Sequence, residues 1–340
     1  MGRKSINVSE YREVDCLSYS ALSAYNKNPL DYYNKYILKT EIEETENIRL
    51  GKLLDTKITD PDNFDNYFVL AKAPTPAPQM VRFCQLLLEE YNPEDGIETG
   101  LRLAYNRLDA EKTSTKLQKN FESMVTSFND TAKEYFQELL ESKTKTLVNI
   151  EEATISEEIF KKWKQSKQFQ LLDGEEEQLK FPIYGNIGDE EFKCEIDRLI
   201  WNHEKKYVKP RDLKITGFVE DFFIQRYLKL NYYLQQGIYT FLLRQWMDDN
   251  GFKEYKIENF GFEVLDSSNK LQPLLYICED DYYQQSWEGF YWGNKYYKGV
   301  IQLISELNKS KELNVWNISI KNLTNGGIVY MPKIEEWKDI

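Results

Sequence analysis

The spacing of apolar residues changes near residue 178, and this change constrains the fold more than any other feature of the chain. From about residue 79 to 170 apolar side chains recur at helical intervals, whereas beyond 178 they alternate with polar ones, as in β-strands. Strands are therefore expected at 178–187, 190–201 and 207–215, joined by Gly188-Asp189 and by a turn over 202–205. Short turns between successive strands predict an antiparallel meander.

Two of these strands carry charged residues on one face. Side chains two residues apart on a strand point to the same side, which groups Lys193, Glu195 and Asp197 on the second strand. The same rule places Asp212 beside Lys214 on the third strand. An acid on one strand followed by Asp-x-Lys on the next is a way in which metal-dependent phosphodiesterases hold a divalent ion next to an ammonium group.

The remaining pattern predicts an α/β fold. Helices are expected over 18–39 with a break at Pro29, over 49–59, through most of 79–170, and over 219–248 and 280–307. Further strands are expected at 259–265 and 273–278, with a strand-like tail at 328–331. We expect one domain over 1–340, in which 1–170 is mainly helical and 171–340 forms the catalytic core.

Composition excludes several classes of protein. Apolar residues make up 41% and charged residues 29% of the 340 positions, and no apolar run is long enough for a membrane span, so a cytoplasmic protein without membrane attachment is expected. The four cysteines are far apart in sequence, which argues against zinc and against an iron–sulfur cluster. His203 is the single histidine, so a multi-histidine metal site is excluded.

The net charge of −12 is unfavourable for binding a polyanion such as DNA. The charge is uneven, because the segment from Lys193 to Lys229 contains nine Lys or Arg against six Asp or Glu. A basic cleft in an acidic protein and a chance scatter of charges both explain this distribution.

Several short motifs occur in an order typical of one group of nucleases. They are Ser18-Tyr-Ser-Ala-Leu22 with Tyr25 and Pro29, Gly51-Lys-Leu-Leu-Asp55, Glu177, Ile196-Asp197-Arg198-Leu199, Asp212-Leu-Lys214-Ile-Thr216 and Gln235-Gln-Gly-Ile-Tyr239. Together they resemble the PD-(D/E)xK nuclease superfamily, and within it the RecB-type, RecE-like and lambda-exonuclease-like phage exonucleases. Each motif alone is weak.

The resemblance implies a restriction-endonuclease-like core, a mixed central sheet flanked by helices, with an N-terminal helical elaboration. It implies an exonuclease that acts on DNA ends in phage recombination, in the host cytoplasm if the protein is phage-encoded. A single-strand annealing recombinase and a homo-oligomer, such as the rings of that branch, are the partners it suggests besides DNA. It also implies that Gln235 and Tyr239, one helical turn apart, contact the nucleic acid.

The predicted chemistry depends on three side chains and one carbonyl group. The carboxylates of Asp197 and Asp212 would bind Mg²⁺ or Mn²⁺, with the backbone carbonyl of Leu213 as a further ligand. Lys214 would orient the attacking water and offset charge on the phosphorus. Asp55 and Glu177 are two additional candidate ligands.

The chain departs from the family pattern at two points. Asp55 stands where many RecB-type nucleases have histidine, and Lys209-Pro-Arg precedes Asp212 in place of apolar residues, which predicts a bulged or edge strand there. Glu177 is one of three consecutive acids and is not distinguished from Glu175 and Glu176 by sequence.

Two alternative functions stay open at this point. An endonuclease of the same superfamily, of the restriction or CRISPR-adaptation type, would use the same residues. A nuclease fold kept as an inactive DNA-binding or assembly module would be expected to have lost one of Asp197, Asp212 and Lys214, and all three are present.

Overall fold

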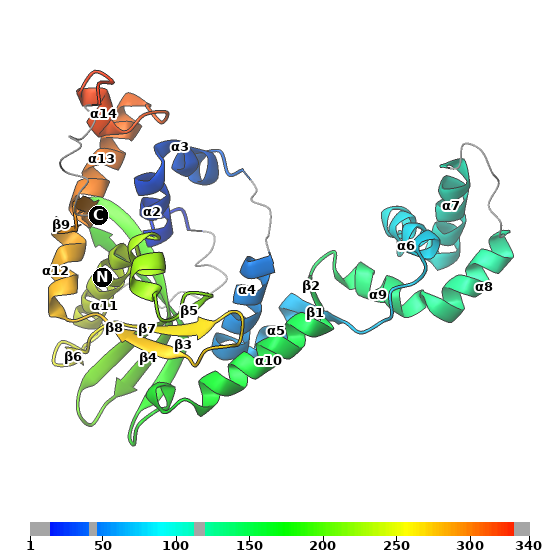
Figure 1. Cartoon of the computed structure of the whole chain (residues 1–340), viewed down its shortest axis with the longest axis horizontal. Helices are drawn as coiled ribbons and strands as arrows, with labels where there is room; N and C mark the ends of the chain where they lie inside the picture. Colours follow the sequence, from blue (N-terminus) through cyan, green and yellow to red (C-terminus); the bar gives the residue numbers. More distant parts are fainter. Residues whose placement is uncertain (1–13, 41–45, 112–119, 330–340) are drawn as a thin grey trace. The chain divides into compact units, whose positions relative to one another are not determined.

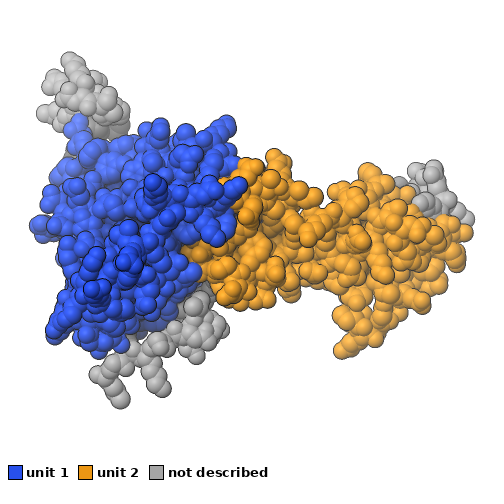
Figure 2. All heavy atoms as spheres, turned by 90° about the horizontal axis from the view of Figure 1, so that it is seen from below, with its two compact units in different colours: residues 1–51, 159–340 blue, residues 52–158 orange. Residues whose placement is uncertain are grey.

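The computed structural model describes residues 14–40, 46–111 and 120–329. The chain divides into two compact units, coloured separately in Figure 2. Unit 1 consists of Met1–Gly51 and Ile159–Ile340, and unit 2 of Lys52–Glu158. Residues 14–40 therefore belong to the same unit as the expected catalytic core.

A mixed six-stranded sheet forms the centre of unit 1 (Figure 1). Its strands are β3 (Glu176–Ile187), β4 (Glu190–Asn202), β5 (Tyr207–Thr216), β6 (Lys256–Ile257), β7 (Gly261–Asp266) and β8 (Leu274–Ile277). The order is β3-β4-β5-β7-β8, with β6 also paired to β5. β3, β4 and β5 are antiparallel to one another, β7 is parallel to β5, and β8 is antiparallel to β7. The expected meander is confirmed, and so is the mixed sheet.

Helices flank this sheet in unit 1. They are α2 (Tyr19–Lys27), α3 (Pro29–Tyr32), the π-helical turn η1 (Tyr33–Ile37), the 3₁₀ turn η3 (Lys167–Phe169), the π-helical turn η4 (Phe223–Leu228), α11 (Tyr232–Asp249), α12 (Asp280–Glu288), α13 (Val300–Leu313) and α14 (Ile320–Thr324). α2 begins where the sequence predicts, because the Ser18 side chain accepts a hydrogen bond from the Ala21 amide at 3.3 Å.

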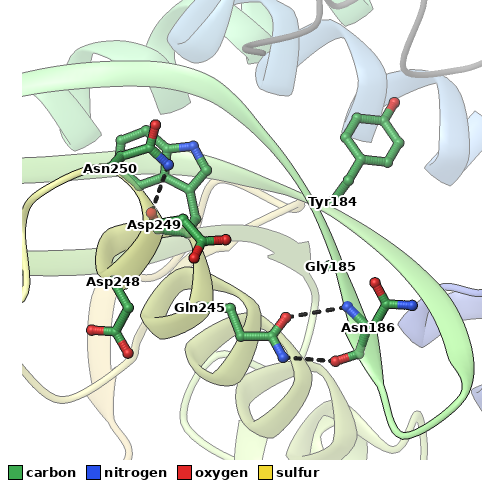
Figure 3. Close-up of a pocket in the computed structure, with 8 residues that line it drawn as sticks. Tyr184, Gly185, Asn186, Gln245, Asp248, Asp249 and Asn250 are labelled. Carbon is green, nitrogen blue, oxygen red and sulfur yellow. Dashed lines mark hydrogen bonds between the residues drawn. The ribbon is translucent and has the colours of Figure 1, made fainter. Parts of the chain in front are cut away.

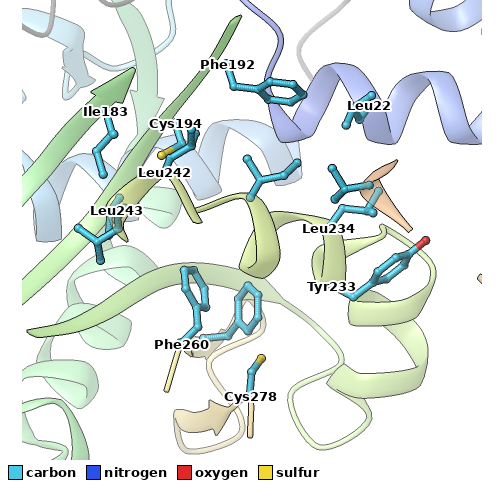
Figure 4. Close-up of a cluster of buried hydrophobic side chains, with 14 of the residues drawn as sticks. Leu22, Ile183, Phe192, Cys194, Tyr233, Leu234, Leu242, Leu243, Phe260 and Cys278 are labelled. Carbon is cyan, nitrogen blue, oxygen red and sulfur yellow. The ribbon is translucent and has the colours of Figure 1, made fainter. Parts of the chain in front are cut away.

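The main core of unit 1 lies between α11 and the sheet. α11 contributes Leu234, Ile238 and Leu242, which are spaced by four residues and so share one helix face. They belong to the same buried cluster as Phe192 and Cys194, which share one face of β4 (Figure 4). Each fully buried side chain of this size contributes about 1.5–3 kcal/mol. This packing fixes α11, and with it Gln235, against the sheet.

Unit 2 is mostly helical. It contains η2 (Pro61–Asn63), α5 (Phe64–Tyr67), β1 (Phe68–Ala71), α6 (Pro78–Glu90), α7 (Gly96–Ala110), α8 (Phe121–Thr131), α9 (Lys133–Glu141) and β2 (Thr146–Asn149), while α4 (Glu46–Thr59) and α10 (Ile150–Gln165) span its two boundaries. Phe83, Phe128 and Phe136 are at the centre of its core. The parallel pair β1–β2 was not expected from the sequence.

The single helix expected over 280–307 is wrong. α12 ends at Glu288, a hairpin of β9 (Gly289–Trp292) and β10 (Lys295–Lys298) follows, and α13 begins at Val300. Gly289 has φ +84, and a Cβ there would lie 2.6 Å from the Tyr297 carbonyl oxygen. The two-residue Gly293-Asn294 turn between the strands is a standard hairpin signal that outweighs the helical spacing of the aromatic residues.

The helix expected over 219–248 is also interrupted. Asn231 adopts the left-handed conformation, with φ 60, between η4 and α11. Asparagine tolerates this conformation better than most residues, so the chain can leave η4 here and begin α11 at Tyr232. The strand-like tail is not observed at Ile328 and Val329, and residues 330–331 lie outside the described residues.

β5 is central and pairs with β4 in continuous register, so the prediction of an edge or bulged strand is wrong for β5 as a whole, but Lys209 and Pro210 are in the ladder with β4 alone. The Val208 carbonyl accepts a hydrogen bond from the Glu258 amide at 2.8 Å, on the side of β6. Because backbone groups alternate in direction along a strand, the other even-numbered residues of this part of β5 also direct theirs toward β6 and β7. Pro210, which has no amide hydrogen, therefore falls in the interval between the end of β6 and the start of β7. Its carbonyl accepts from Arg211 Nη1 at 2.9 Å.

Throughout the part of the chain that the structure describes, the helices are too short or too polar to span a bilayer.

Candidate functional site

The candidate site lies where β4 and β5 separate. Their ladder ends at the Arg198–Arg211 pair, one residue short of Asp197 and Asp212. The Leu213 amide donates to Asp197 Oδ2 at 2.8 Å and so bonds to a side chain on β4 instead of to its backbone. In an extended strand the carbonyl group points to the same side as the amide of the same residue, so the Leu213 carbonyl also faces this opening.

Asp212 is held in a buried environment. Its side chain is only 4% exposed, it forms an ion pair with Lys214 through Oδ2, and its Oδ1 accepts from Gln235 Nε2 at 2.5 Å. Burial raises the pKa of Asp212 to about 7, and the negative charge of Asp197 adds to this effect, while the ammonium of Lys214 opposes it. The pKa of a carboxylate in this position would be lowered by a bound divalent cation.

Lys214 lies on the same face of β5 as Asp212, as the strand alternation predicts. Burial alone would lower the pKa of Lys214, but the charge of Asp212 outweighs it and the net direction is upward. Nζ lies 4.5 Å from the centre of the Tyr232 ring, at the first residue of α11. Lys214 is therefore a fixed cation beside the carboxylates.

The structure brings a second ammonium group to this site, which sequence reasoning missed. Lys180 Nζ on β3 lies 2.9 Å from Asp197 Oδ1 and 3.8 Å from Glu195 Oε1. The signal was present in the sequence, because counting outward from the Gly188-Asp189 turn along two antiparallel strands places residue 180 opposite residue 197.

One further cation, also missed, lies beyond Lys214 on the same face of β5. Arg226 on η4 donates from Nε to Thr216 Oγ1 at 2.8 Å and stacks over Phe218 at 4.6 Å. Asp212, Lys214 and Thr216 alternate along β5, so the Arg226 guanidinium extends the polar row from the carboxylates.

The structure does not bring Glu177 to the site. Glu177 Oε2 accepts from Arg198 at 2.9 and 2.7 Å, and Arg198 follows Asp197 directly on β4 and so points to the opposite face of the sheet. Arg198 also pairs with the buried Glu263 and donates to the Phe169 carbonyl at 3.1 Å. The structure thus pairs Glu177 with Arg198, on the face of the sheet opposite Asp197.

Asp55 lies on α4, in unit 2, and its backbone carbonyl accepts from the Thr59 hydroxyl at 2.7 Å. Its role as a metal ligand stays a prediction.

Gln235 and Tyr239 occupy one side of α11 but differ in their surroundings. Gln235 is buried, and its amide nitrogen bonds to Asp212, which makes Gln235 a partner of the carboxylate. Tyr239 is half-buried and packs edge-on against Phe260, with 6.1 Å between ring centres. Contact of either residue with nucleic acid stays a prediction.

The donor types at this site are those of an oxygen-preferring divalent cation. Asp197 and Asp212 supply two carboxylates on facing strands, and the Leu213 carbonyl faces the same opening, which is the type of donor set that Mg²⁺ and Mn²⁺ prefer. Over the described ranges there is no group of three or more His, Cys, Asp or Glu side chains arranged to hold a metal. A metal here would therefore rely on the two carboxylates and on backbone or water oxygens.

A pocket elsewhere on unit 1 has a different character. Its lining includes Tyr184, Gly185, Asn186, Gln245, Asp248, Asp249 and Asn250 (Figure 3). The Gln245 amide donates to the Asn186 carbonyl at 2.7 Å and accepts from the Asn186 amide at 3.2 Å, which satisfies the outer edge of β3. A Cβ at residue 185 would lie 2.4 Å from Gln245 Oε1, so a larger residue there would displace the Gln245 side chain. Gln245 therefore covers this edge of β3. The pocket contains none of the expected catalytic residues.

Fold and site together define an α/β protein with two facing carboxylates and two ammonium groups at a strand opening. The chain is similar in fold to the crystal structure of a protein named "Putative exonuclease" from Eubacterium rectale, with a TM-score of 0.50 and 12% sequence identity over 98% of this chain and 96% of that one. No protein-family model and no curated protein matches the chain.

Proposed function

We propose that this protein is a divalent-metal-dependent DNA nuclease with a PD-(D/E)xK core. The observation that carries the proposal is the convergence of Asp197, Asp212 and Lys214 where β4 and β5 separate. Asp-x-Lys triplets are common in charged chains, but a triplet buried opposite a second carboxylate is not expected of a solvated strand edge. The fold similarity to the protein named as an exonuclease is consistent with this assignment.

The residues have distinct roles in this proposal. Asp197, Asp212 and the Leu213 carbonyl would hold Mg²⁺ or Mn²⁺, and Gln235 keeps the Asp212 carboxylate in place. A bound ion would supply an acidified water and withdraw negative charge from the phosphate. Lys214 orients the attacking water and offsets charge that develops on the phosphoryl oxygens.

Within this class we propose an exonuclease acting at duplex ends, as in phage recombination. The motif order resembles that branch, and the structural neighbour is named as an exonuclease, without a branch. A recombinase that anneals the single strands produced, and a homo-oligomer, belong to the same proposal. The net charge of −12 requires the DNA to bind along a limited basic surface, for which Lys180, Lys214 and Arg226 are the candidate side chains.

The experiment compares linear and closed circular duplex DNA of the same sequence, incubated with Mg²⁺ and with wild type or Asp212→Ala. Loss of the linear DNA alone, by wild type alone, supports the exonuclease. Cutting of the closed circular DNA would instead identify the protein as an endonuclease. Binding of DNA without cleavage in Mg²⁺ or Mn²⁺ assigns the inactive module.

A further inference from the structure

Lys180 has an unusual backbone for its position in the sheet. It lies within β3 but has φ 50, the left-handed conformation that a lysine rarely adopts. Its neighbours Leu179 and Phe181 pair with Arg198 and Ile196, whereas the position opposite Asp197 is left out of the ladder. Strained backbone of this kind persists where the surrounding structure imposes it, and it occurs frequently at functional sites.

The conformation directs the Lys180 ammonium between two carboxylates. Nζ is 2.9 Å from Asp197 Oδ1 and 3.8 Å from Glu195 Oε1, and these two acids share one face of β4. The other oxygen of Asp197 accepts from the Leu213 amide, on the side of Asp212. Asp197 is thus bordered by a fixed cation on one side and by the proposed metal position on the other.

A nuclease that uses two metal ions needs a second cation position beside the first. The two ions lie roughly 3.5–4 Å apart and share a carboxylate, with a further acid completing the second position. Here Asp197 would be the shared carboxylate and Glu195 the further acid, but the ammonium of Lys180 stands between them. A fixed positive charge at that point repels a divalent ion.

We propose that Lys180 supplies the second positive charge of the catalytic centre in place of a second metal ion, so that the centre binds one divalent ion, between Asp197 and Asp212. This inference rests on the proposed function and adds the metal stoichiometry to it. The ammonium then faces the substrate phosphate from the side opposite Lys214, as a point charge that holds a phosphoryl oxygen.

The test counts Mn²⁺ ions bound per chain by calorimetry and by electron paramagnetic resonance, without DNA and so without any cleavage. We expect one ion for wild type and two for Lys180→Met, because Glu195 and Asp197 then share an open cation position. Lys180→Gly should also bind two ions, and glycine adopts the left-handed conformation freely, so this variant retains the fold if methionine disturbs it. Adding Glu195→Gln to Lys180→Gly should return the count to one.

Two controls distinguish the loss of the Lys180 charge from a general disturbance of the fold. Lys180→Arg keeps the positive charge and should bind one ion. Lys209→Met removes another ion-paired lysine of the same sheet, whose partner is Glu175, and should also bind one ion. Two ions bound by wild type, or one ion bound by Lys180→Gly, would overturn the inference and leave the proposed nuclease intact. Absence of Mn²⁺ binding by wild type would instead overturn both.

Discussion

Gln235 on α11 donates a hydrogen bond to Asp212 on β5, at 2.5 Å and in a buried environment. The bond orients the carboxylate that carries the proposed metal site. Partners of metal ligands typically contribute 10–100-fold to metal affinity or activity. We therefore expect Gln235→Ala to lower Mg²⁺-dependent cleavage by about 10–100-fold, with a matching loss of Mn²⁺ affinity in calorimetry.

The same helix offers a matched control for this prediction. Gln245→Ala removes an equivalent side chain from α11, where it caps the edge of β3 and does not contact Asp212. Cleavage by this variant should equal that of wild type, and an equal loss in both variants would show that the effect comes from the helix and not from Asp212.

The buried ion pairs of Arg198 provide a prediction about stability. Arg198→Met leaves the Glu263 carboxylate buried without its ion-pair partner, which costs about 3–5 kcal/mol in unfolding free energy. Glu177→Gln should cost only about 1 kcal/mol, because the Glu177 side chain is 31% exposed and its charge is screened by solvent. Urea denaturation measures both values.

The same Glu177→Gln variant tests the role of Glu177. Since Glu177 contacts Arg198 on the face of β4 opposite Asp197, Mn²⁺ affinity should be unchanged. A tenfold loss of affinity would restore Glu177 as a metal ligand.

Asp55 can be tested in the same binding experiment. If Asp55 completes the metal site, as its position in the Gly51-Lys-Leu-Leu-Asp55 motif implies, Asp55→Asn should weaken Mn²⁺ binding about 10-fold or more. Glu157→Gln is a suitable control, because Glu157 is an acid of the same unit that pairs with Lys57. Equal affinities for wild type and Asp55→Asn would remove Asp55 from the proposed site.

The cysteines give a prediction about reactivity and pH. Burial raises the pKa of Cys84 and Cys278 to about 12 and raises the pKa of Cys194 as well. Because a raised pKa leaves the thiol protonated, these three groups should resist a disulfide reagent at pH 8. Cys16 is half-buried, so about one thiol per native chain should react quickly with the reagent. In the unfolded chain all four thiols should react. Rapid reaction of all four native thiols would contradict the buried environments.

The sequence predicted the central sheet well because its signals are local. Alternation along β3, β4 and β5, with short turns between them, is visible in the residues themselves and already places Asp212 beside Lys214. The hairpin after α12 was missed because its aromatic residues also fit a helical spacing, and only the pair Gly293-Asn294 indicates the turn.

The partners of the site residues depend on contacts between distant segments, which spacing alone does not determine. Glu177 is 21 residues from Arg198, and its choice of partner follows from the antiparallel register of β3 and β4. The contact of Gln235 with Asp212 depends on how α11 packs on the sheet, and the central position of β5 depends on β6 and β7, which lie some 50 residues later in the chain.

The most direct measurement is cleavage of linear duplex DNA by wild type and by Asp212→Asn, with Mg²⁺ and with Mg²⁺ removed by a chelator. Asparagine has the same shape and keeps an oxygen for Gln235, so both proteins should fold alike in circular dichroism. We predict degradation by wild type only when Mg²⁺ is present, and a rate lower by a factor on the order of 10³ for Asp212→Asn. Cleavage by the variant at the wild-type rate, or the absence of cleavage by folded wild type in Mg²⁺ and Mn²⁺, would contradict the assignment of this site.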